Sequence, residues 1–171
     1  MGTRARVSAP RGSSGNVVRD SALGLVPQTL DAYLALNRAI WERGPLPPAE
    51  VEVARLRNAQ RVGCVFCKAV RYDLARADGL TEERVGMIDE AFAHSGLSER
   101  EKLIIAFTDQ YHADPGGMPG QLRAQLERVF SGEELAHLSL AVAHFSGFSR
   151  CAVALGGMPD EVPVMEISLP D

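Results

Sequence analysis

The feature that most constrains the fold is a long apolar segment near the C-terminal end of the chain. Residues 133–155 are rich in Ala, Leu and Val, and the sequence Gly-Gly-Met-Pro follows them directly. Ser131 precedes the segment, with Glu134 three residues on, which is the capping-box pattern of a helix N-terminus. Glycine and proline commonly follow a helix C-terminus. We therefore predict a single long helix over 133–155.

Similar start and stop signals occur along most of the chain. Apolar residues at helical spacing between these signals predict helices at 28–43, from Pro47 to about 62, from Cys64 to about 78, and at 82–93, 99–112 and 119–130. Aromatic residues make up only 6% of the sequence, and strands are usually enriched in them. With no alternating strand pairs and no internal repeat in evidence, the predicted class is all-α, with six to seven helices and an extended C-terminal tail.

Length and charge limit the number of domains and the kinds of molecule that the protein can bind. The 171 residues and the formal charge of −4 fit one domain, over 25–171, and argue against nucleic acid as a partner, because phosphate-binding surfaces need a basic excess. Residues 1–24 are predicted to be a mobile basic tail, and their lack of an apolar core indicates a cytoplasmic protein. No apolar run is expected to reach the roughly 20 residues of a membrane span.

One pair of residues carries recognisable chemistry: Cys64 and Cys67. On a helix, positions i and i+3 lie on the same face, so the two sulfurs should be neighbours. At a first helical turn, the positive end of the helix dipole favours thiolate, which is the nucleophilic form. If an oxidant converts one sulfur to sulfenic acid, the other can condense with it to a disulfide. The spacing therefore suits reversible thiol chemistry.

Two other interpretations of the cysteine pair stay open at this point. The cysteines could simply be buried, since free cysteine is among the most buried residue types. They could also bind zinc, which needs two further ligands. The candidates for these ligands are Cys151, His94, His112, His137 and His144.

Glu52 is the other candidate for chemistry. It shares an apolar helix face with Leu56 and Ala59, and that face leads towards the cysteines. A carboxyl group buried on such a face has a raised pKa suited to proton transfer. The alternative is that Glu52 lies at the solvent edge of its helix, as most glutamates do.

Taken together, these residues resemble a known family. The pattern Glu52-x11-Cys64-x2-Cys67 is similar to that of the alkylhydroperoxidase D-like (AhpD-like) branch of the carboxymuconolactone decarboxylase superfamily. The ending HFSGFSRCAVALGGMP, with Arg150 and Leu155-Gly156, is similar to the Asn/Ser-Arg…Leu-Gly ending of that superfamily. The resemblance covers about residues 25–160.

The resemblance implies an all-helical fold that assembles into homotrimers or homohexamers, and reduction of a small peroxide by the cysteine pair. Cys67 would become the sulfenic acid, Cys64 would be its proton donor and disulfide partner, and Glu52 would belong to the proton relay. An external thiol or dithiol would then reduce the disulfide. The cycle requires no metal and no organic cofactor.

The chain departs from the family pattern beside the second cysteine. Arg71 and Phe66 stand where better-studied members have histidines. At i+4 from Cys67 on a helix, Arg71 could lower the thiol pKa by its charge, although it cannot shuttle protons. His144 could replace the missing imidazole or could be an ordinary core histidine. A lyase of the same superfamily and a non-catalytic helical or metal-binding module are the alternative functions.

Overall fold

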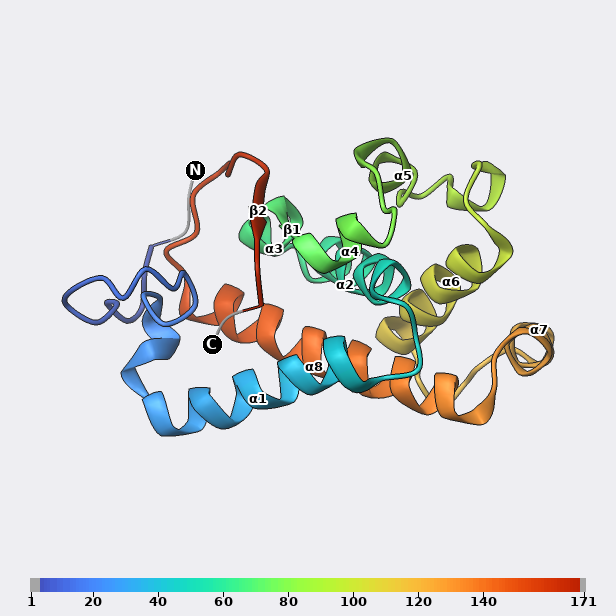
Figure 1. Cartoon of the computed structure of the whole chain (residues 1–171), viewed down its shortest axis with the longest axis horizontal. Helices are drawn as coiled ribbons and strands as arrows, with labels where there is room; N and C mark the ends of the chain where they lie inside the picture. Colours follow the sequence, from blue (N-terminus) through green and yellow to red (C-terminus); the bar gives the residue numbers. More distant parts are fainter. Residues whose placement is uncertain (1–3, 170–171) are drawn as a thin grey trace.

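The computed structural model describes residues 4–169, which form a mainly helical unit with one small sheet (Figure 1). The α-helices are α1 (Pro27–Arg43), α2 (Pro48–Val62), α3 (Val65–Ala69), α4 (Asp73–Ala77), α5 (Glu82–Gly86), α6 (Glu99–Ala113), α7 (Gly120–Val129) and α8 (Gly132–Leu155). The short elements are the 3₁₀ helices η1 (Ala22–Leu25) and η2 (Phe92–His94) and the strands β1 (Val70–Tyr72) and β2 (Met165–Ile167). The helical class is confirmed.

Helix α2 is the centre of the molecule. It packs between α6 and α8, and α1 lies along α8 (Figure 1). From Val51 to Ala59 every residue of α2 is buried, including its charged and polar members. Polar side chains enclosed in this way must find partners inside the protein. Helix α2 therefore carries most of the internal hydrogen-bonding groups that surround the cysteines.

Helix α8 is the predicted long apolar helix, and its Ser131–Glu134 capping box is formed. Its length and composition would also allow it to cross a membrane, so the expectation that no run reaches that length was wrong. One such helix is weak evidence for a membrane protein, because core helices share these properties. One face of α8 is buried in the protein, where it contributes to the core and to the surroundings of the cysteines.

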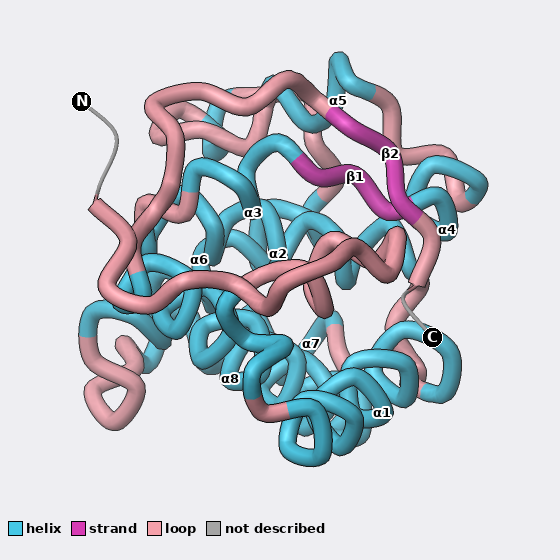
Figure 2. The backbone as a smooth tube through the Cα atoms, turned by 90° about the vertical axis from the view of Figure 1, so that its left-hand side faces the viewer, coloured by secondary structure: helices cyan, strands magenta, loops and turns pink. Residues whose placement is uncertain are grey.

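The helix predicted from Cys64 to about 78 is interrupted, which corrects that prediction. Helix α3 ends at Ala69, and β1 follows it and pairs in parallel with β2 (Figure 2). The Arg55 guanidinium donates to the carbonyl oxygens of Cys67 and Val70, at 2.7 Å each. In a continuous helix those carbonyls would accept from N–H groups four residues on. Strand pairing replaces the helix here, and the sheet itself was not predicted.

The helix predicted over 82–93 is also shorter than expected, because α5 ends at Gly86. Beyond it the Asp89 carboxylate accepts the N–H of Ala91, at 2.8 Å. Such local side-chain hydrogen bonds compete with helical ones. The remainder of the segment forms only the short helix η2.

The described part of the N-terminal segment, residues 4–26, packs against the end of α8. The backbone N–H of Arg6 donates to the carbonyl of Leu155 at 2.8 Å. Val18 is buried with Leu30 and Leu34 of α1. The described C-terminal residues include β2, which pairs with β1, the strand that directly follows α3. The predicted mobility of residues 1–24 stays a prediction, and residues 1–3 lie outside the described range.

Candidate functional site

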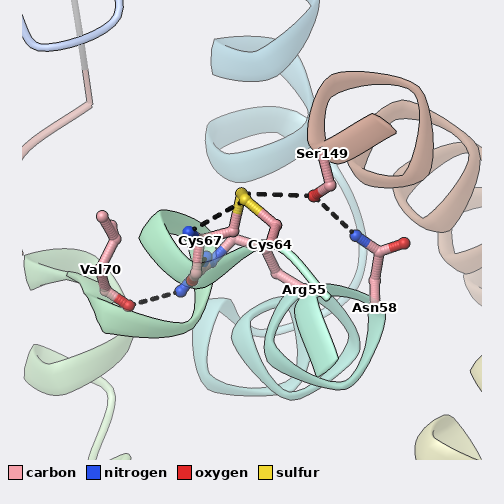
Figure 3. The surroundings of a disulfide bond; sticks show 6 residues. All are labelled: Arg55, Asn58, Cys64, Cys67, Val70 and Ser149. Atoms are coloured by element: carbon pink, nitrogen blue, oxygen red, sulfur yellow. Dashed lines mark hydrogen bonds between the residues drawn. A yellow bond between two sulfur atoms is a disulfide. The ribbon is translucent and has the colours of Figure 1, made fainter. Parts of the chain in front are cut away.

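The structure joins Cys64 and Cys67 in a disulfide at the start of α3 (Figure 3). Cys64 is the N-cap residue of this helix, and its Sγ accepts the N–H of Cys67 at 3.2 Å. Gly63, with a φ of 72°, turns the chain from α2 into this cap. A positive φ of this size favours glycine, because other residues are strained there. The tight turn and the i, i+3 spacing together place the two sulfurs side by side.

The sulfurs differ in their access to space inside the protein. Cys64 is 0% exposed, whereas Cys67 is 7% exposed and lines a cavity of about 50 Å³. This inner cavity is walled mainly by aromatic and apolar side chains, among them those of Tyr33, Phe66, Tyr72, Phe145 and Phe148. It exceeds the roughly 30 Å³ that a water molecule occupies. A small molecule that entered it would therefore meet Cys67 and not Cys64.

A larger outer cavity adjoins the inner one. Its volume is about 600 Å³, and it shares the lining residues Val18, Phe66 and Phe148 with the inner cavity. The N-terminal segment forms one side of it, through residues 13–23, and the end of α8 forms another. The outer cavity thus lies between the N-terminal segment and α8, next to the cavity that Cys67 lines.

Glu52 is buried and forms an ion pair with Arg55. It is 1% exposed, which contradicts the alternative at the solvent edge. Its carboxylate accepts two hydrogen bonds from Arg55, at 2.6 and 2.7 Å. Burial works against the charge of Arg55, but the Glu52 carboxylate outweighs it and raises the pKa of Arg55. Glu52 is therefore buried, as its place on the apolar helix face indicated, and it is engaged by Arg55, a partner that the sequence did not reveal.

Arg71 is not placed as the sequence predicted. Because α3 ends at Ala69, Cys67 and Arg71 do not share a helix face. The Arg71 guanidinium instead donates to Glu82, at 3.0 Å, and to the carbonyls of Lys68 and Val70. The cation that binds the backbone of the cysteine segment together with Glu52 is Arg55, which sequence reasoning did not single out.

His144 lies in the wall of the inner cavity, together with Cys67. It is 6% exposed and its ring stacks on that of Tyr33. Its Nε2 is 3.1 Å from Oδ1 of Asn37, while its Nδ1 is buried with no partner among the described residues. Because the Asn37 oxygen only accepts, Nε2 carries the proton and Nδ1 is a free acceptor. Burial lowers the pKa of His144 to about 4, so this imidazole is neutral at pH 7.

This lowered pKa predicts a loss of stability in acid. The folded pKa of His144 is about 4 and the ordinary value is 6.5, so the unfolded chain binds more protons between these values. Stability that is present above pH 6.5 is thus lost as the pH falls towards 4, by roughly 2–3 kcal/mol between pH 7 and 4.5. Urea unfolding of the wild type and of His144→Gln at pH 7 and at pH 4.5 measures this loss of stability.

His112 and His137 titrate in the same direction, because burial lowers the pKa of each. The comparison with His144→Gln isolates the contribution of His144. Equal losses of stability in the wild type and this variant would show that the His144 environment is not desolvated.

A line of polar side chains that sequence reasoning missed reaches Cys67 from the other side (Figure 3). Ser149 Oγ donates to Cys67 Sγ at 3.5 Å, and Asn58 Nδ2 lies 3.1 Å from Ser149 Oγ. His112 Nε2 is 2.9 Å from Asn58 Oδ1. Ser149 stands in the Ser-Arg sequence near the end of α8, which could have drawn attention to it. Asn58 and His112 belong to no motif.

The zinc interpretation has no ligand set in the described part of the chain. Within residues 4–169, no group of three or more His, Cys, Asp or Glu side chains is arranged to hold a metal ion. Cys151, one of the candidate ligands, is exposed as a free thiol.

Comparison with solved structures gives the fold. A protein of unknown function from Agrobacterium tumefaciens, whose description suggests the antioxidant defence protein AhpD, aligns over 89% of this chain and 95% of its own, with a TM-score of 0.67 and 22% identity. The debrominase Bmp8, solved as a cysteine-to-alanine variant in complex with 2,3,4-tribromopyrrole, aligns over 91% of both chains, with a TM-score of 0.73 and 16% identity. A peroxidase-related protein from Silicibacter sp. aligns over 75% of this chain and 69% of its own, with a TM-score of 0.65 and 16% identity.

The sequence comparisons match part of the chain to one family. No curated protein matches the chain significantly. The model of the carboxymuconolactone decarboxylase family matches residues 27–95, which include α1, α2 and both cysteines of the disulfide. Residues 27–95 are thus similar to the carboxymuconolactone decarboxylase family, and the fold of the chain is similar to that of an AhpD-like structure.

Proposed function

We propose that the protein is a thiol-dependent peroxidase in which Cys64 and Cys67 cycle between dithiol and disulfide. The observation that carries this proposal is the unequal placement of the two sulfurs. Cys67 lines the inner cavity, while Cys64 is fully enclosed and within bonding distance of it. A nucleophile at a substrate cavity with a second thiol behind it is the arrangement that sulfenic acid chemistry requires.

The proposed reaction has three balanced steps. Cys67 attacks the terminal oxygen of a hydroperoxide, so that an S–O bond forms, the O–O bond breaks, and an alcohol leaves with the proton of the thiol. Cys64 then attacks the sulfenic acid, which forms the disulfide and releases water. An external thiol or dithiol finally reduces the disulfide by thiol–disulfide exchange and is itself oxidised.

His144 is our candidate for moving the proton in the first step. Its Nδ1 is a free acceptor in a cavity wall that also includes Cys67. A neutral imidazole can take the proton of the Cys67 thiol and return it to the alkoxide leaving group. Glu52 is held by Arg55, so we assign this pair to support of the cysteine segment and not to proton transfer. Arg71 has no role in our proposal.

The remaining partners are proposals as well. We expect a small peroxide substrate, a cytoplasmic location and a homotrimeric or homohexameric assembly. Leu36 of α1 and Leu140 of α8 are exposed apolar residues that would suit a contact between subunits. The cycle needs no bound cofactor.

A second candidate reaction is reductive dehalogenation of a small aromatic compound. The fold is similar to that of a debrominase, and the outer cavity of about 600 Å³, which adjoins the inner one, is large enough for a substituted ring. Two thiols and an aryl bromide would give the disulfide, the debrominated arene and hydrogen bromide. Both candidate reactions use the same cysteine pair and differ in the compound that oxidises it.

The experiment that tests the proposal treats the fully reduced protein with hydrogen peroxide, cumene hydroperoxide or 2,3,4-tribromopyrrole in separate reactions. We expect one Cys64–Cys67 disulfide per peroxide consumed, by mass spectrometry, and continued consumption with dithiothreitol present. Bromide release without peroxide consumption would replace the proposal with dehalogenation. Thiols that resist all three compounds would contradict both reactions, and the lyase alternative would then be tested with lactone acids.

A further inference from the structure

Four side chains from three helices form a continuous hydrogen-bonded line that ends on Cys67. Ser149 and Arg150 come from α8, Asn58 from α2 and His112 from α6. Beyond the contacts already described, Arg150 Nη2 lies 3.4 Å from Nδ1 of His112. Asn58 and Ser149 are 0% and 4% exposed, so no bulk water competes for their hydrogen-bonding groups. We call this line of contacts the Arg150–Cys67 chain. Its buried groups can form hydrogen bonds only with other protein groups.

The chemistry of Arg150 fixes which group donates and which accepts in each hydrogen bond of the Arg150–Cys67 chain. A guanidinium group only donates hydrogen bonds, so Nδ1 of His112 must accept, and Nε2 must then carry the proton of the neutral ring. The Nε2–H group needs an acceptor, which places the amide oxygen of Asn58 towards His112, as observed.

The same assignment of donors and acceptors extends from Asn58 to the sulfur of Cys67. With its oxygen facing His112, Asn58 presents its NH₂ group to Ser149, whose Oγ therefore accepts. The one hydroxyl proton of Ser149 is left free to point at Cys67 Sγ, 3.5 Å away. Every donor in the chain consequently points towards the sulfur, and a positive charge stands at the far end.

We propose that the Arg150–Cys67 chain stabilises negative charge on the Cys67 sulfur, and that Ser149, Asn58, His112 and Arg150 are positioning residues for its thiol chemistry. The inference rests on the proposed function in one respect, namely that Cys67 is the reacting sulfur. Aligned hydrogen bonds polarise one another, so a charge beyond direct contact still strengthens the last donor. The chain offers Cys67 an electrostatic support that Arg71, directed at Glu82, does not give.

The surroundings of His112 keep it in the neutral form that the chain requires. Burial lowers its pKa, the charge of Arg150 from α8 lowers it further and Arg61 of α2 adds to this, while Asp109 on its own helix opposes them. Asp109 itself is engaged by the guanidinium groups of Arg57 and Arg61, each through two hydrogen bonds of 2.6–2.7 Å. A second proton on His112 would direct Nδ1–H at Arg150, where it has no acceptor.

The test measures the thiolate pKa of Cys67 in the reduced full-length protein, from the pH dependence of alkylation by iodoacetamide. Cleavage after Arg61 and Lys68 yields one peptide with both cysteines, whose fragment ions separate Cys64 from Cys67. The exposed Cys151 serves as a reference thiol in every sample. No peroxide is used, so this experiment and the test of the proposed function can fail independently.

Two substitutions act on the buried part of the chain. Ser149→Ala removes the donor to the sulfur, and we expect the pKa of Cys67 to rise by about one unit, a tenfold loss of thiolate below the pKa. Asn58→Asp is nearly isosteric but only accepts when ionised, so it draws the Ser149 proton away from the sulfur and should raise the pKa at least as much. Thr108→Val is the matched control, because this buried hydroxyl bonds only its own helix, at Ile104.

Two substitutions at the exposed end keep the test independent of folding. Arg150 lies at the surface, so its replacement leaves the core intact. Arg150→Ala frees His112 to adopt the other tautomer, which reverses the chain, and the pKa of Cys67 should rise. Arg150→Lys retains a group that only donates and should restore a value close to wild type. An unchanged Cys67 pKa in folded Ser149→Ala, or equal values in the Ala and Lys variants of Arg150, would overturn the proposal.

Discussion

Replacing Cys67 with Ser is expected to abolish peroxide consumption, whereas replacing Cys64 with Ser should leave a single turnover. Cys67 is the sulfur that lines the inner cavity, so its loss removes the nucleophile itself. Losses of about 10³-fold or more are usual when a catalytic nucleophile is deleted. In Cys64→Ser the first attack still occurs, but the sulfenic acid has no partner. One equivalent of peroxide should be consumed, and dimedone should label Cys67.

Cys151→Ser is the matched control for both variants, because this cysteine is exposed and lies outside the disulfide. It should behave as wild type in peroxide consumption and in dimedone labelling. The reverse outcome, a single turnover in Cys67→Ser and none in Cys64→Ser, would exchange the roles of the two sulfurs. Full activity in the double Cys→Ser variant would point to the lyase alternative.

The sequence predicted the fold best where local signals were strong. Helices α1, α2, α6 and α8 begin and end within a residue or two of their predicted positions, because proline, glycine and capping boxes mark their termini. The prediction failed between Cys64 and Asp78, where the pattern of apolar residues permits a helix. There the carbonyl oxygens accept from Arg55 and β1 pairs with β2, a strand roughly a hundred residues further along the chain. Contacts of that kind have no local signature.

The candidate site was predictable only as far as helical spacing reaches. The pairing of Cys64 with Cys67 and the burial of Glu52 both follow from positions on a single helix or turn. The residues that contact the cysteines and Glu52, and that determine their chemistry, cannot be predicted from such positions. Arg55 was overlooked because an arginine in an apolar helix is expected to reach solvent, and His112 reaches Asn58 from a helix more than fifty residues away. Arg71 was assigned to the sulfur because the break after Ala69 could not be foreseen.

The second large effect is expected at the buried ion pair of Glu52 and Arg55. Glu52→Ala leaves the Arg55 guanidinium enclosed without its counter-ion, and such a change typically costs about 3–5 kcal/mol of unfolding free energy. Arg55→Met should cost as much, because it leaves Glu52 unpaired and removes the donors to the carbonyls of Cys67 and Val70. Urea unfolding at pH 7 measures both values.

The double variant Glu52→Ala/Arg55→Met separates the charge effect from the loss of packing. It contains no buried charge, so its loss of stability should be well below the sum of the two single changes, by a coupling of about 1–3 kcal/mol. Arg128→Ala breaks an exposed pair with Glu99 and is the control, with an expected cost below about 1 kcal/mol. A Glu52→Ala variant as stable as Arg128→Ala would contradict the buried pair.

The same variants show whether the ion pair also shapes the chemistry. Arg55 connects the Glu52 carboxylate to the carbonyl of Cys67, so the pair fixes the backbone that holds the reacting sulfur. If this is its role, the double variant should fold and yet form the Cys64–Cys67 disulfide more slowly after peroxide is added, because the sulfurs are held less firmly in register. A stable double variant with the wild-type rate of disulfide formation would restrict Glu52 and Arg55 to stability alone. Support of the cysteine segment would then fall to the turn at Gly63 and the cap at Cys64.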